Sequence, residues 1–356
     1  DNVLAEVVEG NMGRLSMNGQ SPAAINGCWQ CHGSVVKVME NGRPDPSTWP
    51  NTGIGRINPD GSKGSCSACH SRHRFSLVVS RQPDSCGKCH MGPDHPQKEI
   101  YEESKHGIAF KAFKEDMRLD AQPWRAGIEY SAAPTCATCH MSATEELPVT
   151  HDVGTRISWN LRPPISEKID AKAIKAGEQV VPWEERRKKM KVVCKKCHAE
   201  NYVNGFYLQF DSAINLYNEK FGKPATSIIK MMKAGGVLTA TNFDEELEWT
   251  YFYLWHHEGR RARHGASMMA PDYTQWHGFF EVAERFYIHF VPQVREACED
   301  KIRRGGETAN AAKTVLAELD SILNREEHMW FLGKMTGDEK ARRKLAAEEF
   351  KNRYAQ

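Results

Sequence analysis

The chain has 356 residues, and its 48 basic and 46 acidic side chains leave a formal net charge of +2. A nearly balanced charge gives no support to nucleic-acid binding, which usually shows a strong basic excess. No uninterrupted apolar run of about 18 residues occurs, so the sequence predicts no membrane span. The chain starts at Asp1 without a visible signal peptide, which predicts a mature or trimmed product.

Ten of the eleven cysteines fall into five identical Cys-x-x-Cys-His frames. Two thiols at this spacing can bond the two vinyl groups on one porphyrin edge, and the adjacent histidine can ligate the iron. Random placement of 11 Cys and 15 His would give about 0.01 such frames in this length. The cysteines are Cys28, Cys31, Cys66, Cys69, Cys86, Cys89, Cys136, Cys139, Cys194 and Cys197, and the proximal histidines are His32, His70, His90, His140 and His198.

Two other uses of Cys-x-x-Cys pairs fit less well. A zinc site does not require histidine immediately after the second cysteine, and a redox dithiol would occur once. The sequence therefore predicts five covalently bound hemes c. The remaining Cys298 is expected to be an inert, buried or half-buried thiol.

The frames all lie between residues 28 and 198, so hemes must supply much of the core there. We expect a mainly α multiheme cytochrome c, with a heme-dense, loop-rich domain over 1–200 and a long-helix domain over 201–356. The second domain would serve oligomerisation and complete the active site. Heme c is normally attached outside the cytoplasm, which predicts a periplasm or an equivalent lumen, such as the anammoxosome.

Helix signals are clear only after residue 200. Capping residues, glycines and apolar spacing predict helices that start at Asp211, Thr226, Asn242 and Pro271. The first should stop near 222–224, the second at Gly235 and the third near Arg263, and Pro292 should kink the fourth. Two more are expected over 315–323 and 344–354. The apolar stripes indicate helix packing or subunit contact.

Ten histidines lie outside the frames, more than five hemes need as second axial ligands. A pure electron-transfer heme usually takes a second histidine, whereas a catalytic heme keeps that position open. His289 and His328, on amphipathic helices, are expected to be structural. For Arg260, Arg261 and Arg263, a solvated helix face and pairing with heme propionates both remain open. The candidate distal ligands, each weighed against a surface or core role, are His73, His106, His151, His257 and His264.

The sequence resembles the hydroxylamine oxidoreductase family of octaheme cytochromes. The order and spacing of the five frames carry the resemblance, together with the strings at 69–73, 92–95, 133–136 and 272–276. Family members carry eight hemes, and the five frames match the fourth to the eighth. Three hemes of the family therefore have no frame in this sequence. The resemblance favours a trimmed or partly recovered chain over a separate polypeptide that supplies these three hemes.

The resemblance implies the site and its chemistry. The catalytic heme would be the one on Cys28 and Cys31, five-coordinate and cross-linked to Tyr273 of an adjacent subunit in a homotrimer. Asp94 and His95 would accept protons as hydroxylamine is oxidised to nitric oxide or nitrite. Electrons would leave through bis-His hemes to a redox partner cytochrome. From spacing alone, Asp94 and His95 are turn residues and Tyr273 is a helix-start aromatic.

Three alternatives stay open. Hydrazine dehydrogenase would use the same heme and tyrosine to produce dinitrogen. A reductase of nitrite or hydroxylamine is disfavoured, because reductive members of the family lack the cross-linking tyrosine. An electron-transfer cytochrome with every iron bis-His would bind no exogenous ligand.

The five frames give the first testable prediction. The intact mass of the purified chain should exceed the mass of the polypeptide by five heme groups, because each frame forms two thioether bonds. A smaller increment would show that at least one frame does not attach heme.

Overall fold

The computed structural model describes residues 38–43, 45, 68–71 and 74–354. The chain divides into two compact units. Unit 1 comprises Asp1–Met91, Pro96–Ser158 and Ile169–Asn204; unit 2 comprises Gly92–His95, Trp159–Lys168 and Gly205–Gln356. Cys28, Cys31, His32, Cys66 and His73 lie outside the described residues.

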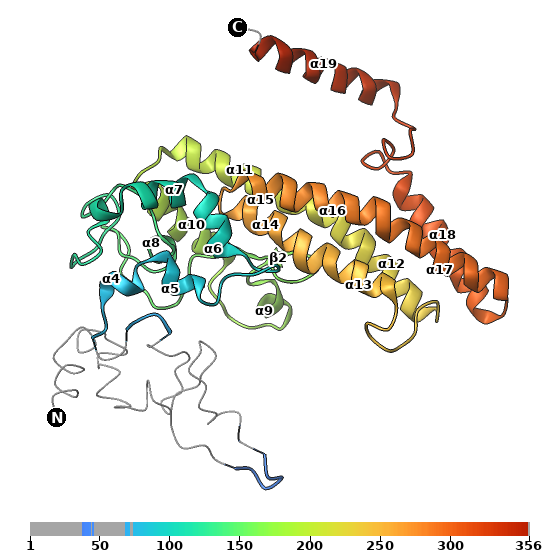
Figure 1. The fold of residues 1–356 in the computed structure, drawn as a ribbon, viewed down its shortest axis with the longest axis horizontal. Helices are drawn as coiled ribbons and strands as arrows, with labels where there is room; N and C mark the ends of the chain where they lie inside the picture. The colour runs from blue at the N-terminus through green and yellow to red at the C-terminus, as the bar shows by residue number, and fades with distance from the viewer. Residues whose placement is uncertain (1–37, 44, 46–67, 72–73, 355–356) are drawn as a thin grey trace. The chain divides into compact units, whose positions relative to one another are not determined.

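The described part of unit 1 consists of short helices joined by long loops (Figure 1). Side-chain capping explains where several of these helices begin. The Ser104 hydroxyl accepts a hydrogen bond from Gly107 N at the start of one helix, and Thr135 forms a reciprocal capping box with Thr138 at another. The helices are α4 Leu77–Ser80, α5 Pro83–Gly87, α6 Gln97–Glu103, α7 Lys105–Ala112, the 3-10 turn η3 Lys114–Met117, α8 Cys136–His140, α9 Ala171–Lys175 and α10 Trp183–Cys194.

Unit 2 is built from long helices interrupted by π-helical segments. They are α11 Glu200–Tyr217, η4 Asn218–Gly222 and α12 Lys223–Ala234; α13 Glu246–Phe252, η5 Tyr253–Glu258 and α14 Gly259–Ser267; α15 Pro271–Thr274, η6 Gln275–Phe280, α16 Glu281–Glu284, η7 Arg285–Phe290 and α17 Val291–Arg304; α18 Glu307–Leu323; and α19 Gly337–Tyr354. The described strands are β1 Trp159–Asn160 and β2 Glu167–Lys168, an antiparallel pair with Trp159 opposite Lys168. A mainly α fold with almost no sheet is thus confirmed.

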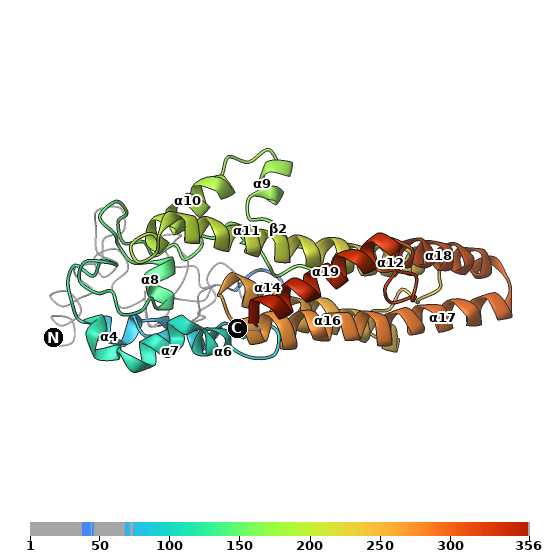
Figure 2. The same cartoon turned by 90° about the horizontal axis from the view of Figure 1, so that it is seen from above.

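The core of unit 2 forms where these helices pack. Tyr217, Leu254, Phe286, Phe290 and Leu319 are all at most 1% exposed. Figures 1 and 2 show α17 running alongside α18. The reversal between them passes through Gly305 and Gly306, whose φ angles of +76° and +85° are strained for other residues. Cys298 is fully buried in this core, as expected, and burial raises the pKa of its thiol to about 11.

Several predicted helix ends are wrong. The first helix starts at Glu200, not Asp211, and runs through 222–224 into α12 without a break. Pro224 is tolerated because it directly follows the π segment η4, whose wider turn relieves the clash of the proline ring with the preceding turn. The third helix continues to Ser267 rather than Arg263, and the last begins at Gly337 rather than Lys344. The stop at Gly235 and the start at Pro271 are confirmed.

Close backbone approach fixes the segment that carries Tyr273. A Cβ on Gly265 would lie 2.7 Å from Thr274 N, and one on Gly278 would lie 2.7 Å from Ala262 Cα. Glycine at both positions therefore allows α14 to pack directly on α15 and η6. No described helix is long and apolar enough to cross a bilayer.

Candidate functional site

The Cys-x-x-Cys-His frames of the described part lie on or beside single helical turns. Residues 136–140 form α8 itself, Cys86 lies near the end of α5, and Cys194 is the last residue of α10. A helical turn brings side chains three positions apart to one side, as two thioether bonds to one porphyrin edge require. None of the seven described frame cysteines forms a disulfide bond, so their thiols fit heme attachment.

Two predicted distal ligands face proximal histidines within unit 1. The ring centroids of His106 and His198 are 6.0 Å apart, and those of His70 and His151 are 6.5 Å apart. A metal–imidazole bond of about 2 Å and a nitrogen about 1.1 Å from the ring centroid place two axial imidazoles about 6 Å apart across one metal ion. Both pairs fit this spacing, which supports their assignment as axial pairs.

The proximal His140 shows how a ring is oriented for ligation. Its Nδ1 lies 3.1 Å from the carbonyl oxygen of Val153. Because a carbonyl only accepts, Nδ1 carries the proton and the basic lone pair lies on Nε2. This is the usual arrangement of a metal-ligating histidine. Burial, more than any other factor, lowers the pKa of His140 and favours the neutral ring.

The other two distal candidates lie on the helix of unit 2 that contains η5. His257 belongs to the π segment, with its ring centroid 5.1 Å from that of Tyr253, and its buried Nδ1 has no hydrogen-bond partner among the described residues. His264 is 7% exposed in α14. A buried ring nitrogen without a protein partner needs an explanation, and for His257 metal ligation would provide one.

The two histidines expected to be structural differ from each other. His328 is fully buried, and its Nδ1 is 2.8 Å from the Tyr287 hydroxyl. It lies in a series of turns after α18, not on a helix as predicted. Its contacts explain it as a core residue. His289 is exposed on η7.

Asp94 lies at the centre of a charged cluster in unit 2. Its Oδ1 is 2.6 Å from His95 Nδ1, and its Oδ2 is 3.0 Å from Arg260 Nη1 and 3.7 Å from His256 Nε2. Arg260 is itself held by a 2.8 Å hydrogen bond from Nε to the carbonyl oxygen of Arg162, and its guanidinium lies over the Trp255 ring. We call Asp94, His95, His256 and Arg260 the Asp94 cluster.

The charges of the cluster keep Asp94 ionised. Burial would raise the pKa of its carboxyl, but the hydrogen bond from His95, together with the neighbouring His95 and His256 rings, outweighs burial and lowers it. The ion pair with Arg260 acts in the same direction. Since a carboxylate only accepts, His95 must donate from Nδ1, which places the lone pair of its neutral ring on Nε2. Burial, chiefly, lowers the pKa of His256 to about 4, so that ring is neutral at pH 7.

Tyr273 lies in α15, four residues before His277, and the two ring centroids are 5.6 Å apart. His277 in turn lies 3.0 Å from Glu281 and 3.6 Å from Asp272. The tyrosine is half-buried on the helix start that the sequence predicted.

The arginine cluster of α14 is not a solvated face. Arg263 is fully buried and donates to the carbonyl oxygens of Gly259, Pro163 and Trp255 and to the Ser166 hydroxyl. Arg261 pairs with Glu281 at 2.7 Å. The sequence did not predict that Arg260 and His256 lie beside Asp94, because Arg260 and Asp94 are 166 positions apart in the chain. Their only sequence signal was the concentration of histidine and arginine at 256–264.

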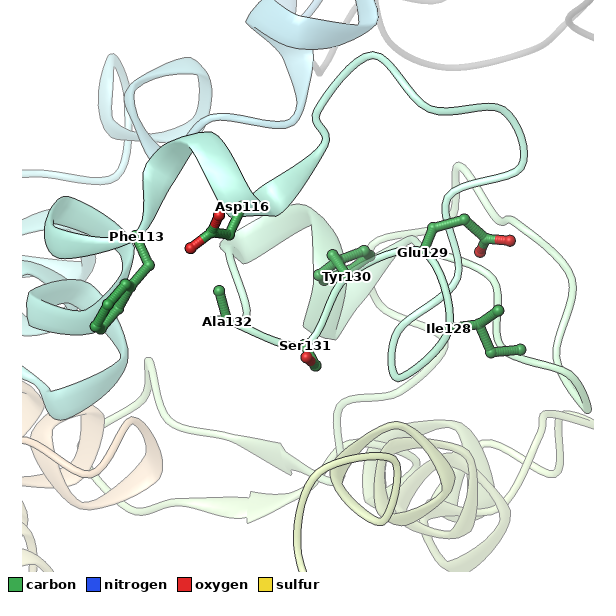
Figure 3. A pocket seen from close by; sticks show the side chains of 7 residues that line it. All are labelled: Phe113, Asp116, Ile128, Glu129, Tyr130, Ser131 and Ala132. Atoms are coloured by element: carbon green, nitrogen blue, oxygen red, sulfur yellow. The ribbon is translucent and has the colours of Figure 1, made fainter.

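Unit 1 also contains an open hollow of about 450 Å³ (Figure 3). Hydrogen bonds from Arg125 hold the pKa of Glu129, one of the hollow's two acidic lining residues, at about 2, so this carboxylate stays ionised near neutral pH. The hollow contains no histidine or cysteine and is not the site described above. It is lined by Phe113, Asp116, Ile128, Glu129, Tyr130, Ser131 and Ala132.

The family of this chain follows from its similarity to known proteins. A family described as "Seven times multi-haem cytochrome CxxCH" matches residues 56–244, just over half of the chain. This chain belongs to the multiheme c-type cytochromes. Four of its five heme frames lie inside the matched range.

Individual relatives agree with this assignment. A probable nitrite reductase-hydroxylamine oxidoreductase fusion protein of Kuenenia stuttgartiensis is 30% identical over 221 residues, which cover 51% of this chain and 26% of that protein. The cytochrome thus spans about a quarter of the length of that relative. The resemblance to hydroxylamine oxidoreductases is confirmed at the level of a multiheme cytochrome.

Solved structures share the fold. A hypothetical multiheme protein superposes with a TM-score of 0.61 at 22% identity, covering 84% of this chain and 75% of its own. A chain of the Kuenenia stuttgartiensis reducing HAO-like protein complex superposes with a TM-score of 0.50 at 20% identity, covering 73% and 61%.

The second testable prediction concerns the axial pair of His106 and His198. Replacing His106 with alanine should convert one heme of the cytochrome from low spin to high spin, because it removes one of two strong-field ligands while the thioether bonds remain. Electron paramagnetic resonance and the absorption spectrum report the change. His289→Ala is the matched control and should leave every heme unchanged. An unaltered spectrum of His106→Ala would reject the pairing.

Proposed function

We propose that this cytochrome oxidises hydroxylamine, to nitric oxide or nitrite, at the heme on Cys28 and Cys31. That heme would keep an open iron face and be cross-linked to Tyr273 of an adjacent subunit in a homotrimer. The observation that carries the proposal is the Asp94 cluster, a carboxylate that both orients a histidine and is itself held by an arginine. The resemblance of 92–95 and 272–276 to the hydroxylamine oxidoreductases connects this cluster with the heme.

The heme, when bound, supplies the coordination position for the substrate nitrogen and accepts its electrons. The residues of this chain handle the protons. Each electron withdrawn from hydroxylamine makes its N–H and O–H bonds more acidic, so a base must receive protons as oxidation proceeds. His95 suits this role, since a neutral imidazole with its lone pair on Nε2 is a proton acceptor.

Asp94 supports this base in two ways. Its hydrogen bond to Nδ1 fixes the tautomer and orientation of His95, and its negative charge stabilises the imidazolium that forms. Arg260 keeps the carboxylate in place and ionised, which prevents Asp94 from taking the proton itself. The side chain of His95 is 39% exposed, so a proton received there can pass to solvent.

Electrons would leave through the bis-His hemes to a partner cytochrome in an extracytoplasmic compartment. The pairs His106–His198 and His70–His151 support this relay, because two axial imidazoles leave no position for substrate. Hydrazine remains a second candidate substrate, since the same residues would accept its protons.

A reductive direction is the other candidate. It is favoured by the relatives whose names contain "nitrite reductase" and "reducing". Tyr273 favours oxidation, because the resemblance associates the cross-link with oxidative members.

The third testable prediction concerns Asp94. Asp94→Asn should lower kcat for hydroxylamine oxidation by about 10²-fold or more, because asparagine cannot stabilise the charged imidazole. Because the pKa of Asp94 is lowered, the wild-type side chain should stay ionised as the pH falls below about 3.9, the ordinary pKa of aspartate. Its contribution to the rate should be lost only when the pH falls below its own pKa. Steady-state rates with hydroxylamine, hydrazine and a dye acceptor measure this.

The matched control is Asp320→Asn, which breaks an exposed aspartate–arginine pair with Arg295 in the same unit. It should change the rate by less than twofold, because exposed ion pairs contribute little. Equal rates for wild type and Asp94→Asn would remove Asp94 from the mechanism.

The fourth testable prediction concerns Tyr273. On denaturing electrophoresis the wild type should run as covalently linked subunits and Tyr273→Phe as single chains with all hemes attached. The phenylalanine variant should lose hydroxylamine oxidation and gain activity as a reductase, because a bond to the macrocycle is one of the protein's means of tuning heme chemistry. Wild-type protein that separates into single chains would contradict the cross-link and favour an electron-transfer cytochrome.

A further inference from the structure

Arg156 is a buried cation bound to one heme frame. Only 3% of the residue is exposed. Its Nη2 donates to the carbonyl oxygen of Ser142 at 2.7 Å, and its Nη1 donates to those of Cys139 at 3.1 Å and Thr138 at 3.3 Å. All three acceptors belong to α8 or the turn that follows it, so the guanidinium lies at the carboxyl end of the heme-binding helix.

This cation has no acidic counterpart within ion-pairing distance among the described residues. Its hydrogen bonds go to neutral carbonyl groups, unlike those of Arg125 or Arg260, which bind carboxylates. Burial lowers the pKa of Arg156, but the ordinary value for arginine is so high that the side chain stays protonated near pH 7. A full positive charge is therefore held inside unit 1.

The frame at 136–140 is also better shielded from water than the other complete frames of the described part. Cys89 and Cys197, the second cysteines at 86–90 and 194–198, are exposed, whereas Cys139 is half-buried. The segment around 136–140 is closed by buried polar side chains: the Tyr130 hydroxyl donates to Thr138 Oγ1 at 2.9 Å. Poor solvent access reduces the dielectric screening between Arg156 and a heme at this frame.

A fixed positive charge changes the balance between ferric and ferrous heme. Reduction lowers the charge of the iron by one, so a nearby cation destabilises the ferric state more than the ferrous state. Burial of the heme acts in the same direction, because low dielectric penalises the more highly charged iron. Charge and solvent exposure are both established determinants of heme reduction potential.

We propose that Arg156 raises the reduction potential of the heme on Cys136 and Cys139, so that electrons in this cytochrome reside there in preference to the hemes at 86–90 and 194–198. The electron that reduces this ferric iron comes from a neighbouring heme of the relay, which is oxidised in the same step. The inference needs only heme attachment at Cys136 and Cys139, inside the range matched by the family, and holds whichever substrate the cytochrome uses.

The fifth testable prediction follows from this role. In a spectroelectrochemical titration of the purified cytochrome, Arg156→Gln should shift one heme wave to lower potential. We expect at least a tenfold change in the ratio of reduced to oxidised heme at fixed potential, which corresponds to about 59 mV for one electron. Glutamine removes the charge and keeps an amide N–H donor, although its shorter side chain makes fewer hydrogen bonds than the guanidinium.

Two further variants separate charge from structure. Arg156→Lys keeps the charge and should change the ratio less than twofold near neutral pH. Arg187→Gln removes another buried arginine of unit 1, whose Nε and Nη2 donate to the Ser158 hydroxyl, and should leave all waves in place. Heme staining and intact mass establish that every heme stays attached.

Each outcome of these measurements either supports or overturns the proposed effect of Arg156 on the reduction potential. Unchanged waves in Arg156→Gln, or equal shifts in the glutamine and lysine variants, would show that Arg156 only clamps the backbone and would overturn it. If Arg156→Gln loses heme, Arg156→Lys still tests whether the charge at position 156 sets the reduction potential. Its amine, once deprotonated at high pH, should lower the potential of the same single heme, and the absence of that step would reject the proposal.

Discussion

The structure depends on one covalent constraint, the attachment of a porphyrin through two thiols with the next histidine as iron ligand. Each frame needs one helical turn and nothing longer, which explains why unit 1 is built from helices as short as α5 and α8. The rings opposite these frames must then come from elsewhere in the chain. His106 and His151 lie 92 and 81 positions from His198 and His70, yet each lies at about the spacing of an axial pair.

Unit 2 meets a different demand, because its candidate functional side chains, apart from Asp94 and His95, lie on long helices. Each of the three longest helical runs contains at least one π segment: η4 precedes Pro224, η5 contains His256 and His257, and η6 follows Tyr273. A π segment adds a residue to the turn and so rotates the side chains beyond it, which explains its frequency at functional sites. Arg263 then fixes this region, with four hydrogen bonds from a single buried guanidinium.

Three arginines with similar side chains have different roles because their acceptors differ. Arg260 binds a carboxylate and keeps it ionised, which in the proposed function supports proton transfer at His95. Arg263 binds carbonyl groups in a helical core and acts structurally. Arg156 also binds carbonyl groups, but those of a helix that contains a heme frame, where we propose that its charge acts on the heme. The position of the acceptors, not the residue type, determines which of these effects an arginine has.

The sequence by itself determined what depends on local chemistry. Cys-x-x-Cys-His needs only adjacent residues to specify heme attachment, and Gly235 ends a helix within one turn. Tertiary structure alone decided that Pro224 does not break its helix, because the relief comes from a π turn that no local propensity encodes. It also decided that Arg260 holds Asp94 and that Arg156 lacks a carboxylate among the described residues. Ion pairs and hydrogen bonds between distant segments depend on distances of a few ångströms, which the packing of whole helices sets and the spacing of residues along the chain does not.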